Sequence, residues 1–331
     1  MRKIAFLAGA ALMISCGTTT KQPKAETANS LTETAVLAAP VTPEGVGAHL
    51  EFLSSDALEG RETGSEGIDR AATYIADHFR QAGIKPFYPQ YRDTLENYQG
   101  YAANVVGYLE GTDPELKDEW VVIGAHYDHI GTVKAVDGDS IANGANDNAS
   151  GTVAVMEIAR KLAVVKDRRR SVLFALFTAE EKGLKGSAHL AKRLKDEGRK
   201  VYTVINFEML GVPMTQDYLV YMTGYEMSNM ARMMNEIAGE AIIGLLPKAK
   251  EYQLFRRSDN YPFYKTYGIP AHTFSTFDFT NFGHYHKAGD EYGLMDPGHM
   301  ANVIERMLPL VEGVVNSKQN AVYLQETGGL E

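Results

Sequence analysis

Short apolar runs, each followed by polar or charged residues, mark the middle of the chain. Three of them, Val121–Ala125, Ser171–Phe177 and Val201–Phe207, have the length and composition of buried strands, and Tyr101–Leu109 reads as a fourth strand. Near-continuous apolar strands that alternate with helices are typical of a mainly parallel sheet covered on both faces. The pattern predicts an α/β fold, a three-layer α/β/α sandwich with a central mixed, largely parallel sheet.

Helical periodicity occupies the stretches between the expected strands. Apolar residues recur at three- and four-residue intervals from Ile68 to Phe79, from Val155 to Val165 and from Met300 to Val315. The segment Thr63–Glu66 fits a capping box before the first helix, and Gly83 is the expected stop after it. We interpret the second and third stripes as core-facing surfaces rather than cofactor sites.

Residue types that bind metals follow the three apolar strands. His126 directly follows the first strand, Glu180–Glu181 come shortly after the second, and Glu208 follows the third. Since ligands bind beyond the carboxyl ends of parallel strands, we expect these groups to meet at one edge of the sheet. Asp147 and His286 add a carboxylate and an imidazole. Two divalent cations need at least five such groups, one of them shared, so the set predicts a two-metal hydrolase.

Six segments resemble the signature segments of the di-zinc aminopeptidase family, which includes bacterial leucyl aminopeptidases, glutamate carboxypeptidase and, more distantly, the glutaminyl cyclases. The resemblance extends from about Gly45 to about Val315. Each segment is weakly specific alone, but their order and spacing together are specific. The segments are Leu58–Ser65, Gly124–His129, Asn143–Gly151, Thr178–Glu181, Arg257–Phe263 and Tyr285–His286.

The resemblance implies an exopeptidase that removes N-terminal residues from peptides and carries two zinc ions per chain. In the family the aspartate that matches Asp147 bridges both metals. His126 and Glu208 would then complete the ligands of one metal, and Glu181 and His286 those of the other.

Three further residues are expected to take part in catalysis. Neighbouring residues at a strand end point in different directions, so Glu180 would face the substrate as the general base for a water activated by the metals. Asp128 would accept the second ring N–H of His126 and fix its tautomer. Tyr285 would hydrogen-bond the tetrahedral oxyanion, with core packing as its alternative role.

Other polar residues near these segments are expected to play smaller parts. We expect His129 and His284 to be structural or to support a ligand, Arg257 to brace its loop and Asp259 to lie near the pocket. The segment Asp137–Ser140 lacks the later ligands of a calcium loop and is expected to be a solvated turn.

One departure from the family pattern leaves alternatives open. Position 208 is most often aspartate in the family, whereas this chain has Glu208. The glutaminyl cyclases use a single zinc and also have a glutamate near this place, so a one-zinc glutaminyl-peptide cyclotransferase is the alternative enzyme. Those enzymes generally lack the pair that His126 and Asp128 provide, which favours the peptidase. A metal-free peptide-binding relative is the third hypothesis, and the intact ligand set argues against it.

The N-terminus has the features of an export signal. Arg2-Lys3 is followed by the apolar run Ile4–Ile14 and then by Cys16, the only cysteine of the chain. This predicts a lipoprotein signal peptide over residues 1–16, although Met13 replaces the usual leucine. Cys16 would be acylated and anchor the protein in the periplasm or at the surface of a bacterium. A soluble secreted form is the alternative.

Composition sets the remaining boundaries. Residues 17–44 are rich in Thr, Ala and Pro and predict a flexible tether, followed by a catalytic domain over residues 45–320 and a tail over residues 321–331. The formal net charge of −9 without a basic stripe gives no support to nucleic-acid binding. We therefore expect peptide substrates as partners, and membrane contact only through the anchor at Cys16.

Overall fold

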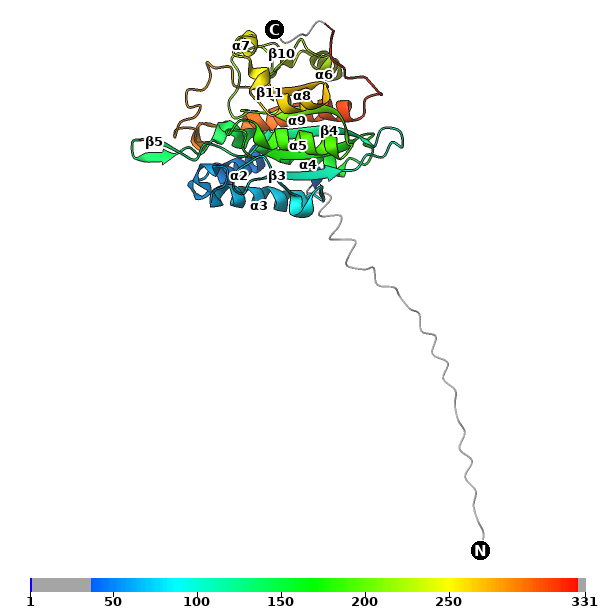
Figure 1. The fold of residues 1–331 in the computed structure, drawn as a ribbon, viewed down its shortest axis with the longest axis horizontal. Helices are drawn as coiled ribbons and strands as arrows, with labels where there is room; N and C mark the ends of the chain where they lie inside the picture. Colours follow the sequence, from blue (N-terminus) through cyan, green and yellow to red (C-terminus); the bar gives the residue numbers. More distant parts are fainter. Residues whose placement is uncertain (2–36, 327–331) are drawn as a thin grey trace. The chain divides into compact units, whose positions relative to one another are not determined.

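A computed structural model describes Met1 and residues 37–326, and the latter form a three-layer α/β/α sandwich (Figure 1). The predicted signal peptide, the predicted anchor at Cys16 and the predicted tether up to residue 36 lie outside the described residues. Among the described helices, none combines the length and the apolar character that a membrane crossing requires.

The central layer is a nine-stranded mixed sheet with the order β1-β3-β7-β4-β8-β11-β9-β10, in which β2 also pairs with β3. Strands β7, β4, β8 and β11 run parallel to one another, while β1, β2 and β3 at one edge and the β9–β11 pair are antiparallel. The predicted mixed, largely parallel sheet is confirmed. Its strands are β1 (Lys85–Pro86), β2 (Arg92–Thr94), β3 (Ala103–Leu109), β4 (Glu119–His126), β7 (Ser171–Phe177), β8 (Lys200–Phe207), β9 (Val220–Met222), β10 (Ile243–Gly244) and β11 (Ala271–Ser275).

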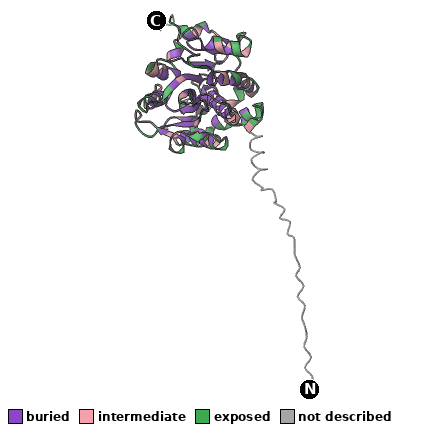
Figure 2. Ribbon diagram, turned by 90° about the vertical axis from the view of Figure 1, so that its right-hand side faces the viewer, coloured by how far each residue is buried: buried purple, intermediate pink, exposed green. Residues whose placement is uncertain are grey.

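Helices cover both faces of this sheet, as the alternation within β4 shows. Val121 and Ile123 pack with residues of the helices on one face, whereas Val122 packs with Leu190 and Phe263 on the other. Figure 2 shows the buried residues concentrated between the layers. The first face carries α2 (Pro43–Leu53), α3 (Glu66–Gln81), α4 (Gly151–Val164), α6 (Met230–Ala238) and α9 (Pro297–Val315), and the second carries α5 (Lys185–Asp196) and α8 (Asn260–Tyr267).

Short elements complete the described chain and carry much of the site. They are the helical turns η1 (Asp56–Arg61), η2 (Pro89–Tyr91), η3 (Ala145–Ser150), η4 (Leu254–Arg256) and η5 (Tyr292–Leu294), the short helix α7 (Pro247–Glu251), and the separate hairpin of β5 (Thr132–Val136) and β6 (Asp139–Ile141). The exposed turn of that hairpin contains Asp137 and Gly138, where a solvated turn is predicted.

The start of α3 differs from the predicted capping box. Ser65 is the N-cap and its hydroxyl accepts the backbone N–H of Ile68 at 3.2 Å. Thr63 lies before the helix, and its hydroxyl instead donates to the Oδ2 atom of Asp128 at 3.1 Å. The capping-box prediction is wrong at this residue because Thr63 is used by the site rather than by the helix.

Both ends of the described chain lie against the sandwich. Helix α2 begins at Pro43 with Thr42 as its N-cap, shortly before the predicted domain boundary at Gly45. Ahead of it, the Nη1 atom of Arg160 donates to the carbonyls of Leu37 and Ala39. In the predicted tail, Val322 is buried and its backbone N–H donates to the hydroxyl of Tyr202.

Candidate metal centre

Three adjacent parallel strands end at the same edge of the sheet and deliver the predicted ligands there. Strand β4 lies between β7 and β8, and its last residue, His126, pairs with Phe177 at the end of β7. Two residues separate the end of β7 from Glu180 and Glu181, and Glu208 directly follows β8. The predicted convergence of strand-end ligands is therefore what the topology produces.

Asp147 lies between two histidines and presents one carboxylate oxygen to each. Its Oδ1 atom is 3.3 Å from Nε2 of His126, and its Oδ2 atom is 3.2 Å from Nε2 of His286. The side chain belongs to the helical turn η3, whose backbone is fixed by Asp290: the carboxylate of Asp290 accepts the N–H groups of Asn146 at 2.7 Å and Asp147 at 3.0 Å. A carboxylate placed in this way can bridge two cations.

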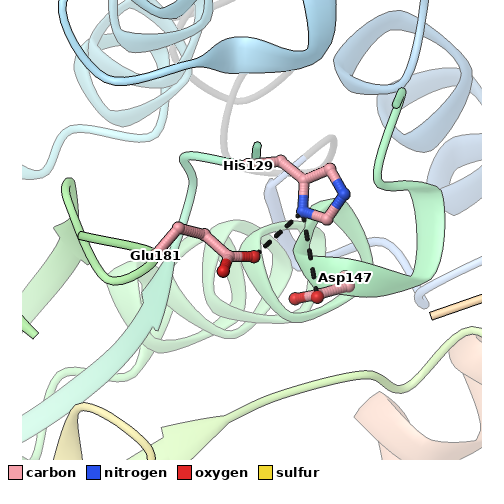
Figure 3. Close-up of side chains that lie close together, drawn as sticks. All are labelled: His129, Asp147 and Glu181. Atoms are coloured by element: carbon pink, nitrogen blue, oxygen red, sulfur yellow. Dashed lines mark ion pairs between the residues drawn. The ribbon is translucent and has the colours of Figure 1, made fainter. Parts of the chain in front are cut away.

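Glu181 lies beside the second of these histidines and also beside a third one. Its Oε1 atom is 3.0 Å from Nε2 of His286 and 3.2 Å from Nδ1 of His129. Nδ1 of His129 also lies 3.8 Å from Oδ2 of Asp147, and Figure 3 shows this nitrogen facing both carboxylates. His129, Asp147 and Glu181 form a group of ligand atoms compact enough to bind one metal ion.

Asp128 is buried at the centre of the site, but its carboxylate does not accept the predicted hydrogen bond from His126. The Nδ1 atom of His126 is 3.7 Å from the carboxylate of Asp128 and 3.2 Å from its backbone carbonyl, so the carbonyl accepts the hydrogen bond. The carboxylate instead accepts the backbone N–H groups of Glu180 at 3.2 Å and Glu181 at 3.3 Å. Asp128 thus orients the glutamate pair, and its backbone fixes the tautomer of His126.

The two remaining acidic candidates face the same cleft. Burial, followed by the proximity of other carboxylates, raises the pKa of Glu180 well above its usual value, with His126 opposing the shift. Burial also raises the pKa of Glu208 to about 6, although a hydrogen bond from the hydroxyl of Ser258 to Glu208 lowers it. Glu180 and Glu208 therefore hold protons more strongly than ordinary glutamates do.

Contacts between acids and histidines favour the charged forms of Asp147 and His286. Burial alone would raise the pKa of Asp147, but His126 and His286 bring it well below its usual value. Burial alone would lower the pKa of His286, but Asp147 and Glu181 raise it to about 10. The site therefore concentrates negative charge around these imidazoles.

The donor set fits divalent cations, and zinc in particular. Carboxylates outnumber imidazoles, and Nε2 of the buried His129 has no hydrogen-bond partner. Mutual repulsion among buried acids costs free energy that a bound dication would remove. Imidazole and carboxylate ligands together are the set that zinc accepts.

A cleft of about 460 Å³ opens beside this cluster. Its wall is partly apolar, through Met209, Leu254, Phe277 and Phe279, and it also contains Tyr221 and Thr223 from β9 and the turn that follows it. None of these six residues was singled out from the sequence, because the segments that carry them contain no motif. The closely spaced aromatic residues Phe277 and Phe279 were the one available signal.

The structure also shows where the remaining candidate residues lie. Tyr285 lines the cleft and stacks on His286 with a ring-centroid distance of 3.9 Å. His284 is exposed. Arg257, expected to brace its loop, is exposed and lines the cleft. Asp259, expected to lie near the pocket, is completely buried.

Comparison with known proteins places this geometry among the peptidases. A probable zinc metalloprotease of Leptosphaeria maculans is 41% identical over 172 residues, which is 49% of this chain and 39% of that protein. Leupeptin-inactivating enzyme 1 of Streptomyces exfoliatus is 30% identical over 261 residues, 74% of this chain and 53% of that protein. The chain thus spans about half or less of the length of these relatives.

Solved structures share the fold at lower identity. The LapA aminopeptidase of Legionella pneumophila has a TM-score of 0.67 at 20% identity, covering 91% of this chain and 79% of LapA. A glutaminyl cyclase of Fimbriiglobus ruber has a TM-score of 0.64 at 18% identity, covering 85% of this chain and 97% of that chain. The profile of peptidase family M28 matches residues 104–311, the segment that contains the whole cluster, and the chain belongs to that family.

Proposed function

We propose that the protein is a zinc-dependent aminopeptidase that holds two zinc ions and hydrolyses the N-terminal peptide bond of its substrates. The observation that carries the proposal is the position of Asp147, with one carboxylate oxygen near His126 and the other near His286. That arrangement supports a shared ligand between two cations. His126 and Glu208 would hold one ion, and Glu181 and His286 the other.

Zinc would supply Lewis-acid chemistry, polarising the peptide carbonyl and making water more acidic. Glu180 would then act as the general base: both glutamates line the cleft, but it is Glu181 whose carboxylate pairs with His129 and His286. Tyr285 would donate to the oxygen that becomes negatively charged, since its ring stacks on His286 at the same cleft.

The cleft supports a substrate bound through its free amino group. The carboxylates of Glu180 and Glu208 line the cleft, and an α-ammonium group is a suitable partner for them. The apolar wall formed by Met209, Phe277 and Phe279 would accept the first side chain of the peptide.

The test is an assay of purified protein against aminoacyl and N-terminal glutaminyl peptides, with zinc counted per chain. Two zinc ions with release of free amino acids would support the proposal. Cyclisation of glutaminyl peptides with one zinc would instead establish the cyclotransferase, and peptide binding without metal or turnover would establish a binding protein.

Removal of metal provides the first specific prediction. A strong chelator should abolish peptide hydrolysis, and added zinc or cobalt should restore it, because the cations would polarise the peptide carbonyl and activate the water. Full activity in protein whose zinc content remains below about one ion per chain would contradict the two-metal proposal.

A further inference from the structure

We propose that His129 is a fourth protein ligand of the zinc ion held by Asp147, Glu181 and His286. This inference rests on the proposed zinc-peptidase function and concerns the same site. It assigns a metal-binding role to a residue for which the sequence suggested only structural support.

The distances match the edges of a tetrahedral zinc site. Zinc–ligand bonds of about 2.0–2.1 Å place the ligand atoms of a tetrahedron about 3.3–3.4 Å apart. Nε2 of His286 lies 3.0 Å from Oε1 of Glu181 and 3.2 Å from Oδ2 of Asp147. Nδ1 of His129 lies 3.2 Å and 3.8 Å from the same two oxygens. The same carboxylate pair therefore faces two imidazole nitrogens at comparable distances.

The two imidazole rings are also placed as two ligands of one ion would be. Their centroids are 5.7 Å apart with an interplanar angle of 67°. Two imidazoles bound to one tetrahedral zinc would have centroids about 5–6 Å apart, given the same bond lengths. Neither ring stacks on the other, so both nitrogens stay available to a shared ion.

Packing holds the ring of His129 in place. The side chain is completely buried, Nε2 makes no hydrogen bond, and Nδ1 contacts the carboxylates of Glu181 and Asp147. Its ring lies against Gly144, which has φ +58°, and a Cβ atom there would be 2.5 Å from Cγ of His129. Figure 3 shows Nδ1 facing the two carboxylates, whose mutual repulsion a cation would relieve. A cation between these groups would satisfy that nitrogen.

A consequence is that the two zinc ions would be bound differently. A site with four protein ligands is of the closed type, whereas the set His126, Asp147 and Glu208 leaves a position open. We therefore expect the zinc near His129 to be bound more tightly than the zinc near Glu208. Stepwise removal by a graded series of chelators should release the ion near Glu208 first.

The decisive measurement is zinc X-ray absorption on the two-zinc protein, which counts imidazole ligands. The proposal predicts about three imidazoles per two zinc ions, from His126, His129 and His286, whereas the set without His129 predicts about two. A wild-type count of two would overturn the proposal. This readout requires no variant and no activity.

Two substitutions separate a ligand from a residue that only supports one. Glutamine at position 129 keeps an N–H donor but has no imidazole. The His129→Gln variant should lose at least about 10-fold in affinity for one zinc ion and one imidazole from the count. Retention of affinity in His129→Gln would show that His129 acts by donating a hydrogen bond, and would overturn the proposal. His286→Gln should weaken the binding of the same zinc ion, so its zinc affinity and imidazole count should resemble those of His129→Gln.

A matched control is available on the helical layer. His78 on α3 is partly buried and contacts the backbone carbonyl of Met156 at 3.1 Å, away from the cluster. His78→Gln should leave both zinc affinities unchanged, which would show that loss of a buried histidine alone does not release metal. If wild-type protein binds two zinc ions with three imidazoles but cleaves no aminoacyl peptide, the proposed function fails and the ligand assignment stands.

Discussion

Glu180 and Glu181 are neighbours with the same side chain, and the fold gives them different surroundings. Both backbone N–H groups donate to the carboxylate of Asp128, which fixes the turn after β7. Ala179 has φ +55° in this turn, a conformation that few non-glycine residues adopt. Both side chains line the cleft, and it is Glu181 that pairs with His286.

The first prediction at this scale separates the two glutamates. Glu180→Gln should keep both zinc ions and lower kcat by roughly 10² to 10⁴, the usual contribution of a general base. Glu181→Gln should lose one zinc ion. Kinetics with an aminoacyl-coumarin substrate and elemental analysis of zinc would measure both effects, with Glu110→Gln on the surface as the control. Loss of metal from Glu180→Gln alone would reverse the two roles.

A second prediction concerns a buried histidine outside the site. His272 on β11 is completely buried; its Nδ1–H donates to the carbonyl of Thr223, and its Nε2 accepts from the hydroxyl of Ser228. Burial lowers the pKa of His272 to about 4, partly opposed by the bond to Thr223. Since an unfolded histidine has a pKa of about 6.5, the unfolded chain binds more protons between these values, and stability falls as the pH falls through this window.

The expected loss from His272 between pH 6.5 and pH 4 is on the order of 3 kcal/mol. Glutamine offers one donor and one acceptor without titrating, so His272→Gln should flatten the decrease in unfolding free energy over this range. Urea unfolding of both proteins without metal would measure it, since metal release then plays no part. Equal pH slopes for the two proteins would contradict the assignment.

At the scale of elements, one arginine links η1 to the segments that carry the ligands. Arg61 is almost completely buried, and its guanidinium donates to the carbonyl of Tyr127 after β4 and to those of Asn143 and Gly144 before η3. It also contacts the carbonyl of Leu53 at the end of α2. Burial lowers the pKa of Arg61 to about 10, so it remains charged at neutral pH.

Replacement of this arginine should affect both stability and metal binding. Arg61→Met would leave four buried carbonyls without their donor, at about 1–3 kcal/mol each, so we expect a loss of at least about 3 kcal/mol. Zinc affinity should also fall, because Tyr127 lies between His126 and Asp128. Thermal unfolding and zinc titration would measure the effects. In contrast, Arg232→Met at the exposed pair with Glu236 should change stability by no more than about 0.5 kcal/mol, and equal losses in both variants would refute the special role of Arg61.

At the scale of the whole molecule, the residues that form the apolar core lie apart from those that line the cleft. The apolar core lies between the sheet and its helices, whereas the cleft lies beyond the carboxyl ends of the parallel strands. The N-terminal segment from residue 37 contacts α4 through Arg160 and is not among the residues that line the cleft. Changes before residue 37 should therefore leave the catalytic domain intact.

This separation leads to a prediction about the proposed anchor. Cys16→Ser should release the protein from membranes, because the acyl chains of a lipoprotein are attached to that cysteine. The specific activity of the released protein should equal that of the wild type. Membrane fractionation together with peptidase assays would measure both properties. Wild-type protein found wholly in the soluble fraction would contradict the anchor and leave the peptidase proposal unaffected.

Local patterns in the sequence were enough to predict the strands that carry the site. The predicted bounds of β7 and the carboxyl end of β8 agree with the structure, because an apolar run between polar residues defines a buried strand by itself. Parallel strands share an edge, so the residues after β4, β7 and β8 were expected to meet, and they do. The apolar stripe from Met300 to Val315 is buried as predicted.

Only the tertiary structure decided how the polar groups pair. Thr63, predicted to cap α3, donates to Asp128, and the carboxylate of Asp128 accepts from the backbone of the glutamates rather than from His126. His129 lies beside Glu181, far from it in sequence. The partner of a buried polar group depends on which distant segments the fold brings within about 3 Å, and sequence spacing carries no record of that distance. The sequence by itself determined which chemistry gathers at the sheet edge, and the packing of separate elements decided which atom faces which.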